Sequence, residues 1–223
     1  MTVKNESNYL GDFLKYEAEA LYCREPVTVL AGAGAARDLT SGMVLGRITK
    51  GAATGAAVAG NTGNGTITAS HTVGAAAKPG VYQVVCIEPL TNSGKFSVED
   101  PDGVVIGIAT VGVQFSTHLT FTIADGATDF AAGDAFTITV AAGSGKVKQI
   151  DFAATDGGDK AYGVLCFDVT APDGVDAKGT AIVNGPAVAS DKGLTWPAGA
   201  TQPQKDAAIA QLKLAGIKVR QGA

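Results

Sequence analysis

The sequence has little charge, few aromatic residues and no long hydrophobic run. Charged residues make up 17% of its 223 residues and aromatic residues 6%, whereas an average globular protein is about 25% charged. No apolar run reaches the roughly 18 residues that a membrane-spanning helix needs. The N-terminus is polar and no apolar stretch follows it, so we expect no secretory signal peptide and synthesis in a cytoplasm.

Basic clusters are also absent from the sequence. Lys and Arg number 17 and Asp and Glu 21, which gives a net charge of -4 and an isoelectric point of about 5.1. Proteins that bind nucleic acids usually carry a basic stripe that neutralises phosphates. We therefore expect neither nucleic acid nor a membrane as a partner.

Residues suited to catalysis or metal binding are sparse. Cys23, Cys86 and Cys166 are far apart and have neither the spacing of a metal site nor that of a disulfide framework. Cys86 and Cys166 lie in apolar runs and are predicted to be buried. His71 and His118 are too few for a zinc site, and no pattern pairs a nucleophile with a base. The sequence predicts a protein that is not an enzyme and that holds no cofactor or metal.

Aspartates cluster in four places, but nearly all of them adjoin Gly or Pro. Asp at such positions commonly stabilises turns, and no cluster completes the calcium-binding loop that ends in Glu. Turn formation is the favoured interpretation and calcium binding is the alternative. The clusters are Asp100 with Asp102, Asp125 with Asp129 and Asp134, Asp156 with Asp159, and Asp173 with Asp176.

Small and β-branched residues are abundant, among them 30 Gly. Between about residues 60 and 142, short runs alternate apolar residues with polar ones such as Thr and are separated by turn signals. Such alternation places one face of a strand in a core and the other in water. Short strands with regular turns predict a small β-sandwich or barrel. The expected strands are 66–69, 81–87, 95–99, 104–113, 119–124 and 135–140.

Two stretches of small residues, 51–57 and 141–145, flank this unit. They offer no large side chains for packing and are interpreted as linkers. The sequence therefore predicts an inserted domain at 51–143, which interrupts a domain made of 26–50 and 144–223.

The C-terminal part predicts further strands and one helix. Thr201 and Gln204 have the spacing of a capping box, and Pro203 lies in the first turn, where its missing N–H does little harm. Gly216 is a typical residue just after a helix end. The expected strands are 147–152, 162–169, 179–185 and 217–219.

The N-terminal segment, residues 1–25, concentrates aromatic and aliphatic residues between charged ones. Leu10, Phe13, Leu14 and Leu21 have helical spacing, whereas residues 17–22 alternate like a strand, and the sequence leaves both possibilities open. The segment is either an element that docks on its own domain or an arm that binds a partner.

Several short motifs, taken in order, resemble the head decoration proteins of lambda-type tailed phages. In that family a strand with the pattern DG…A-x-G-[IV]-L precedes a small β domain, an L-x-W-P turn leads into a helix, and a short apolar strand ends the chain. The resemblance covers about residues 24–50 and 145–220, and the insert is absent from the short prototype. The matching segments are REPVTV at 24–29, GMVLGRIT at 42–49, DGGDKAYGVL at 156–165, LTWP at 194–197, and the capped helix followed by the strand 217–219.

The resemblance implies a mainly β protein, in which a small decoration-protein domain with one C-terminal helix is interrupted by the β-sandwich-like or barrel-like insert. It implies a structural virion protein that forms homotrimers at three-fold and quasi-three-fold points on the outside of the expanded phage head. There it would bind the major capsid protein and stabilise the head against the pressure of packaged DNA. The protein would be made in the host bacterial cytoplasm.

Two sets of residues are expected to make the contacts. Residues 1–25 would form a capsid-binding arm, since aromatic residues are enriched at interface cores and an extended arm can add a strand to a sheet edge. The alternative is that its aromatic residues pack on their own domain. Leu194, Trp196 and Pro197 would form a trimer or capsid interface, with a core position under the helix as the alternative for Trp196. The arm residues are Tyr9, Leu10, Phe13, Leu14, Tyr16, Leu21 and Tyr22.

A different class of function remains open. The insert is Ig-like by its number of strands and would, in this alternative, bind carbohydrate on a host surface. The protein would then be a surface-adhesion or tail-associated binding module.

Overall fold

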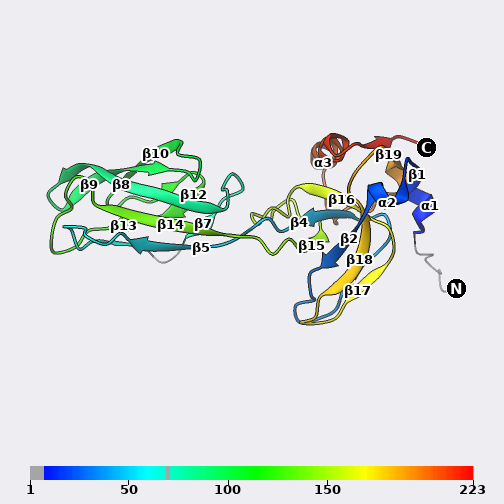
Figure 1. Cartoon of the computed structure of the whole chain (residues 1–223), viewed down its shortest axis with the longest axis horizontal. Coiled ribbons are helices and arrows are strands. Elements are labelled where there is room, and N and C mark those ends of the chain that lie inside the picture. The colour runs from blue at the N-terminus through cyan, green and yellow to red at the C-terminus, as the bar shows by residue number, and fades with distance from the viewer. Residues whose placement is uncertain (1–7, 69–70, 223) are drawn as a thin grey trace. The chain divides into compact units, whose positions relative to one another are not determined.

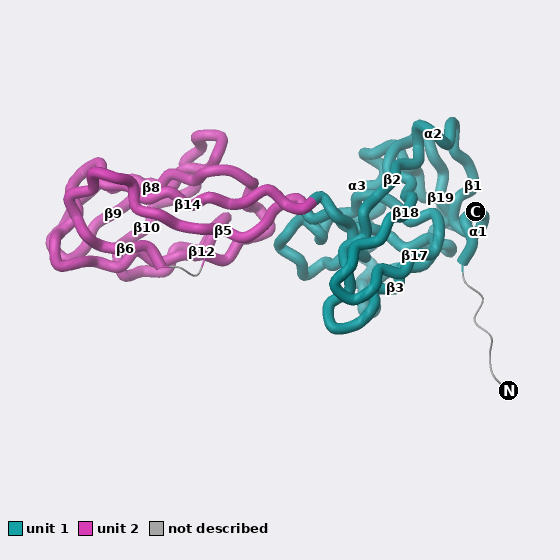
Figure 2. Tube along the Cα trace, turned by 60° about the horizontal axis from the view of Figure 1, so that its bottom comes forward, with its two compact units in different colours: residues 1–48, 145–223 teal, residues 49–144 magenta. Residues whose placement is uncertain are grey.

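A computed structural model describes residues 8–68 and 71–222 and consists mainly of strands (Figure 1). The chain divides into two compact units (Figure 2): unit 1 is Met1–Ile48 with Gly145–Ala223, and unit 2 is Thr49–Ser144. Residues 1–7 of the expected arm and Ala69 of the expected strand 66–69 lie outside the described residues. The prediction of a β-rich chain with a helix near its C-terminus is confirmed.

Unit 1 contains a small closed barrel, a three-stranded sheet and a longer helix. The barrel has the strand order β15-β2-β18-β16-β4, the sheet has the order β1-β19-β20, and β17 pairs with β3. Val29, Leu45 and Leu165 are fully buried in one of the two clusters that form its core. The elements in chain order are α1 (Leu10–Phe13), β1 (Leu14–Glu17), α2 (Ala20–Cys23), β2 (Arg24–Val29), β3 (Arg37–Leu39), β4 (Val44–Arg47), β15 (Val147–Gln149), β16 (Ala161–Leu165), β17 (Val169–Ala171), β18 (Ala177–Ile182), β19 (Ala187–Ser190), the 3-10 helix η1 (Asp191–Gly193), α3 (Gln202–Leu214) and β20 (Ile217–Arg220).

Helix α3 connects β19 to β20, which pair in parallel. The capping box is confirmed: the Thr201 backbone N–H donates to Gln204 Oε1 at 2.9 Å. The helix stops before Gly216, whose φ of +82° suits glycine. Ala208 and Leu212 are buried in the second core cluster of unit 1, so the helix covers the inner side of the sheet.

Unit 2 packs its sheets around an aromatic core. A five-stranded sheet has the order β10-β9-β8-β14-β5, a smaller one the order β11-β12-β7, and β13 pairs with β6. All six aromatic residues of the unit are buried in one cluster: Tyr82, Phe96, Phe115, Phe121, Phe130 and Phe136. The elements are β5 (Lys50–Ala57), β6 (Thr66–Ile67), β7 (Thr72–Val73), β8 (Gly80–Leu90), β9 (Ser93–Glu99), β10 (Val105–Thr110), β11 (Phe115–Ser116), β12 (Leu119–Phe121), β13 (Ile123–Ala124) and β14 (Ala135–Ala142).

The interpretation of residues 51–57 as a linker is wrong, because they form most of strand β5. This strand pairs with β14, where Ala53 lies opposite Val140 and Gly55 opposite Ile138. The partner strand supplies the large side chains, so β5 needs none of its own. A Cβ atom on Gly55 would lie 2.4 Å from Nε2 of His71, so the small residue leaves room for the imidazole.

The chain leaves unit 1 and returns to it at one hydrogen-bonded point. The Ile48 N–H donates to the Lys146 carbonyl at 2.9 Å, and the Gly145 N–H donates to the Ile48 carbonyl at 2.9 Å. The two ends of unit 1 that flank residues 49–144 therefore lie next to each other, in continuation of the β4–β15 pairing.

Candidate functional site

The described part of the N-terminal segment contains both kinds of structure that its sequence left open. Helices α1 and α2 are single turns, and β1 between them pairs antiparallel with β19. A salt bridge also holds β1, because Arg24 forms two hydrogen bonds with the carboxylate of Glu17, one of them 3.0 Å from Nε to Oε2. The bond to Glu17 raises the pKa of Arg24. This part of the chain is therefore integrated into unit 1.

Phe13 does not lie at the surface, which corrects its assignment to the capsid-contacting residues. It is 1% exposed and belongs to the core cluster that also contains Leu212 and Ile217. Leu10 and Leu14 are half-buried against the same cluster. The burial of Phe13 is possible because residue 193 of η1 is Gly, where a Cβ would lie 2.6 Å from the Phe13 Cα.

The other four expected arm residues are exposed. Tyr9 is 69% exposed, Tyr16 56%, Leu21 92% and Tyr22 62%. A single exposed large hydrophobic side chain is common on protein surfaces. Here four occur within fourteen residues, at the start of α1, in β1 and in α2. They form the part of the segment that is available to a partner.

Residues 194–197, which we call the tryptophan turn, contribute side chains to both the core and the surface. Leu194 is buried, while Trp196 and Pro197 are half-buried. Thr195 fixes the turn, since its N–H donates to the Gly42 carbonyl at 2.9 Å and its carbonyl accepts from Val44 N at 3.2 Å. Trp196 packs against the core cluster and also lines a depression of about 450 Å³ whose other walls are formed by α3 and β20. Trp196 is therefore in contact with the core and is also accessible in this depression.

The carboxylates of the aspartate clusters mostly serve turns. Asp134 accepts from the backbone N–H groups of Thr62, Gly63 and Ala131 at 2.8–2.9 Å. Burial alone would raise the pKa of Asp134, but these three amides outweigh it and hold that pKa below its usual range. Within residues 8–68 and 71–222, no group of three or more His, Cys, Asp or Glu side chains is arranged to hold a metal ion.

The histidines and cysteines form no reactive constellation among the described residues. Neither ring nitrogen of His71 has a hydrogen-bond partner there, and burial lowers its pKa. The prediction that Cys86 and Cys166 are buried is confirmed, and Cys23 is buried as well. Burial raises the pKa of Cys166 to about 11 and also raises the pKa of Cys86, so both thiols are held in their unreactive protonated form. In the same part of the chain, no helix is long and apolar enough to cross a membrane.

Comparison with known families identifies the chain. The family model described as bacteriophage lambda head decoration protein D matches residues 3–217. The chain belongs to this family. It is therefore a structural protein of the phage head, and the decoration-protein resemblance of its motifs is confirmed.

Comparisons with individual proteins add little for this decoration protein. No curated protein matches it. Two crystal structures of Xanthomonas campestris FlgL, in space groups H3 and C2, match 52% of the chain with 18% identity and a TM-score of 0.32. The chain spans only 41% and 40% of those two FlgL chains. A likeness this distant carries no argument about fold or function.

Sequence reasoning missed one group of surface residues in the decoration protein. Lys218 and Arg220 alternate with apolar residues in β20 and are exposed, and Lys213 is exposed in the last turn of α3. The signal was present in the sequence as the alternation Ile217-Lys218-Val219-Arg220, in which every second side chain is a cation.

Proposed function

We propose that this decoration protein binds the outside of the expanded phage head as a homotrimer and stabilises the head against the pressure of packaged DNA. The observation that carries the proposal is the family match over residues 3–217. The sites are three-fold and quasi-three-fold points of the shell, where the closed symmetry of a trimer fits the lattice. The partner is the major capsid protein, and the role is mechanical and not enzymatic.

The N-terminal segment is proposed to make the main contact with the shell. Phe13 anchors it in unit 1, and the exposed side chains of Tyr9, Tyr16, Leu21 and Tyr22 supply contact area. Tyr is enriched among interface residues that dominate binding. Because α1 and β1 are already ordered on unit 1, less conformational freedom is lost when they bind.

The tryptophan turn is proposed to contribute to the trimer or capsid interface. Trp196 and Pro197 are half-buried. The depression that Trp196 lines has apolar residues such as Ile209 and polar residues such as Lys205 on its walls. Such a concave surface with an aromatic wall can accept a side chain of a neighbouring molecule.

Expanded heads that lack the protein provide the test. Purified protein is added to such heads and to unexpanded ones, bound copies are counted, and light scattering gives the mass of the free protein relative to the 22.3 kDa chain. We expect saturation at three copies per three-fold site on expanded heads only, and heads filled with DNA that withstand higher temperature. Failure to bind expanded heads, or saturation at one copy per site, would refute the proposal.

Adhesion to a host surface through unit 2 is the second candidate. Its support is a set of exposed aliphatic side chains, including Val104, Val105 and Ile108 near β10. Against it, all six aromatic side chains of unit 2 are buried, although exposed aromatic residues are the most enriched at binding surfaces. Binding of the full chain to host cells, lost on removal of unit 2, would favour this function.

A further inference from the structure

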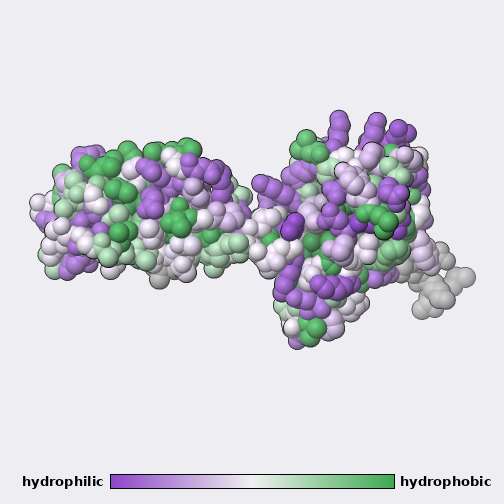
Figure 3. Space-filling view, viewed as in Figure 1, coloured by the Kyte–Doolittle hydropathy of each residue, from purple (hydrophilic) through white to green (hydrophobic). Residues whose placement is uncertain are grey.

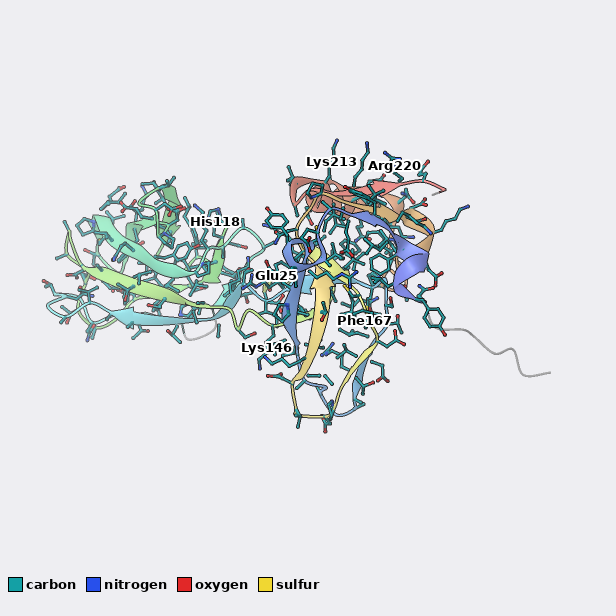
Figure 4. All side chains as sticks on the ribbon, turned by 45° about the vertical axis from the view of Figure 1, so that its right-hand side comes forward. Glu25, His118, Lys146, Phe167, Lys213 and Arg220 are labelled. Atoms are coloured by element: carbon teal, nitrogen blue, oxygen red, sulfur yellow. The ribbon has the colours of Figure 1, made fainter. Side chains whose placement is uncertain are left out.

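The outer face of the sheet β1-β19-β20 carries an aromatic residue on one edge strand and cations on the other. Tyr16, Val188 and Lys218 are register partners across the three strands, so their side chains point to the same face. Arg220 follows two residues after Lys218 and shares that face. The opposite face, which includes Ala189, packs on the core of unit 1. We call Tyr16, Lys218 and Arg220 the cationic face, together with Lys213 at the C-terminal end of α3, which extends from the same side of unit 1 as Arg220 (Figure 4).

The cationic face belongs to the most positively charged part of the chain. Between residues 192 and 220 there are five Lys or Arg and one Asp, a balance of +4, whereas the whole chain has a net charge of -4. The remaining residues therefore carry -8. The charged residues of this stretch are Lys192, Lys205, Asp206, Lys213, Lys218 and Arg220.

The cations of this face are not neutralised by the described part of the chain itself. Some lysines elsewhere form ion pairs, for example Lys148 with Asp156 at 3.0 Å, while the exposed Lys178 donates a hydrogen bond to Thr28 Oγ1 at 2.7 Å. Over residues 8–68 and 71–222, the structure contains no ion pair of Lys213, Lys218 or Arg220. Lys213 and Arg220 extend outward from the same side of unit 1 (Figure 4), and hydrophilic side chains stand out over α3 and β20 (Figure 3).

We propose that the cationic face docks onto an acidic protein surface of the phage shell. The inference rests on the proposed function, because β1 is part of the N-terminal segment proposed to contact the shell. Arg220 can form paired hydrogen bonds with a carboxylate, and Tyr16 with Val188 adds apolar contact next to the charges. The negative balance of the remaining chain disfavours docking by its other surfaces on the same acidic partner, so the charges also set orientation.

An acidic protein is favoured over DNA as the occupant. Proteins that hold duplex DNA by charge commonly make about 6–10 phosphate contacts, while this face offers three cations with an apolar neighbour. The net negative charge of the chain also repels a polyanion at longer range. Tyr and Arg are enriched among residues that dominate protein–protein binding.

The test compares two full-length variants that each lose two positive charges. Lys218→Gln/Arg220→Gln changes the cationic face, and Lys160→Gln/Lys178→Gln removes exposed cations elsewhere in unit 1. Affinity for expanded, decoration-free heads is measured at about 50 and 300 mM salt, a range over which the screening length shortens about 2.4-fold. Thermal unfolding checks that both variants fold.

The expected result separates this inference from the proposed function. The Lys218/Arg220 variant should bind about 10- to 100-fold more weakly at low salt and show a flatter salt dependence, while the Lys160/Lys178 variant should bind within about threefold of the unchanged protein. If the unchanged protein does not bind heads, the proposed function fails. If it binds and the Lys218/Arg220 variant binds equally with the same salt dependence, the cationic face is not a docking surface. Loss of duplex DNA binding in that variant, with head binding intact, would also overturn the proposal.

Discussion

Removal of unit 2 should leave a folded unit 1 that still binds phage heads. The proposed variant replaces residues 49–144 with a single Asn, so that Asn and Gly145 form a two-residue loop between Ile48 and Lys146. The Ile48 N–H already donates to the Lys146 carbonyl at 2.9 Å, and Gly145 already has a φ of +71°. Asn-Gly is the preferred sequence for tight hairpin loops with positive φ.

The energetic cost of this deletion should be small. Every buried residue in the two core clusters of unit 1 lies outside residues 49–144, so no core contact is lost. Closing a flexible loop costs conformational entropy, and each halving of the loop length lowers that cost by ~0.6 kcal/mol. Shortening the 96-residue connection to two residues is between five and six halvings. If the connection were fully flexible, the deletion would therefore stabilise unit 1 by ~3 kcal/mol, which is an upper limit. Pairing of β5 with β14 already holds the ends of unit 2 together, so the gain should lie well below that limit.

Urea unfolding followed by circular dichroism measures the outcome. We expect the free energy of unfolding of unit 1 to be unchanged or raised by at most ~3 kcal/mol, and head binding to be retained. A second deletion with a Gly-Ser-Gly connection controls for strain in the Asn-Gly loop. If both deletion variants are insoluble, or if both lose head binding, unit 2 is required by unit 1 and the proposed division of the chain is wrong.

Three further predictions concern named residues. Phe13→Ala should lower the free energy of unfolding by about 3–5 kcal/mol in urea denaturation because its ring is buried, whereas Tyr16→Ala should change it by about 0.5 kcal/mol or less; equal effects would contradict the assignment of Phe13 as an anchor. Asp134 has a lowered pKa, so its carboxylate stabilises the fold fully above its ordinary pKa of 3.8, and this stabilisation is lost as the pH falls through the lower folded-state value. Asp134→Ala should therefore reduce the thermal unfolding temperature at pH 7 and make that temperature fall less on acidification. His71 also has a lowered pKa, so the unfolded chain binds the proton more readily and stability should fall as the pH drops below about 6.5; thermal unfolding of His71→Leu should show a smaller decrease, and an identical pH profile would refute this.

The sequence predicted β14 and α3 correctly, because the residues that determine these two elements lie within them or at their ends. The alternation Phe136-Thr137-Ile138-Thr139-Val140 predicts β14, and its apolar residues are buried while Thr137 and Thr139 are not. The capping box and the glycine stop predict α3.

Two predictions from the sequence were wrong, because the structure at these places depends on contacts with residues far away in the chain. Residues 51–57 form a strand because β14, some eighty residues later, supplies the large side chains. Phe13 is buried because Gly193 lets α1 approach closely, a contact across 180 residues that no local periodicity encodes.

The N-terminal segment combines an anchor with exposed contacts, and this arrangement bears on how tightly it can bind. Fixing the backbone of a residue costs roughly 1–2 kcal/mol, so an arm that ordered all of its residues only on binding would need many contacts to offset that cost. Here α1, β1 and α2 are ordered on unit 1 through Phe13, the β19 pairing and the bond between Glu17 and Arg24. Most of this cost therefore falls on folding and not on binding. The exposed side chains of Tyr16, Leu21 and Tyr22 can then contribute to affinity from pre-ordered positions, which is why loss of the anchor Phe13 should weaken head binding more than loss of any one exposed residue.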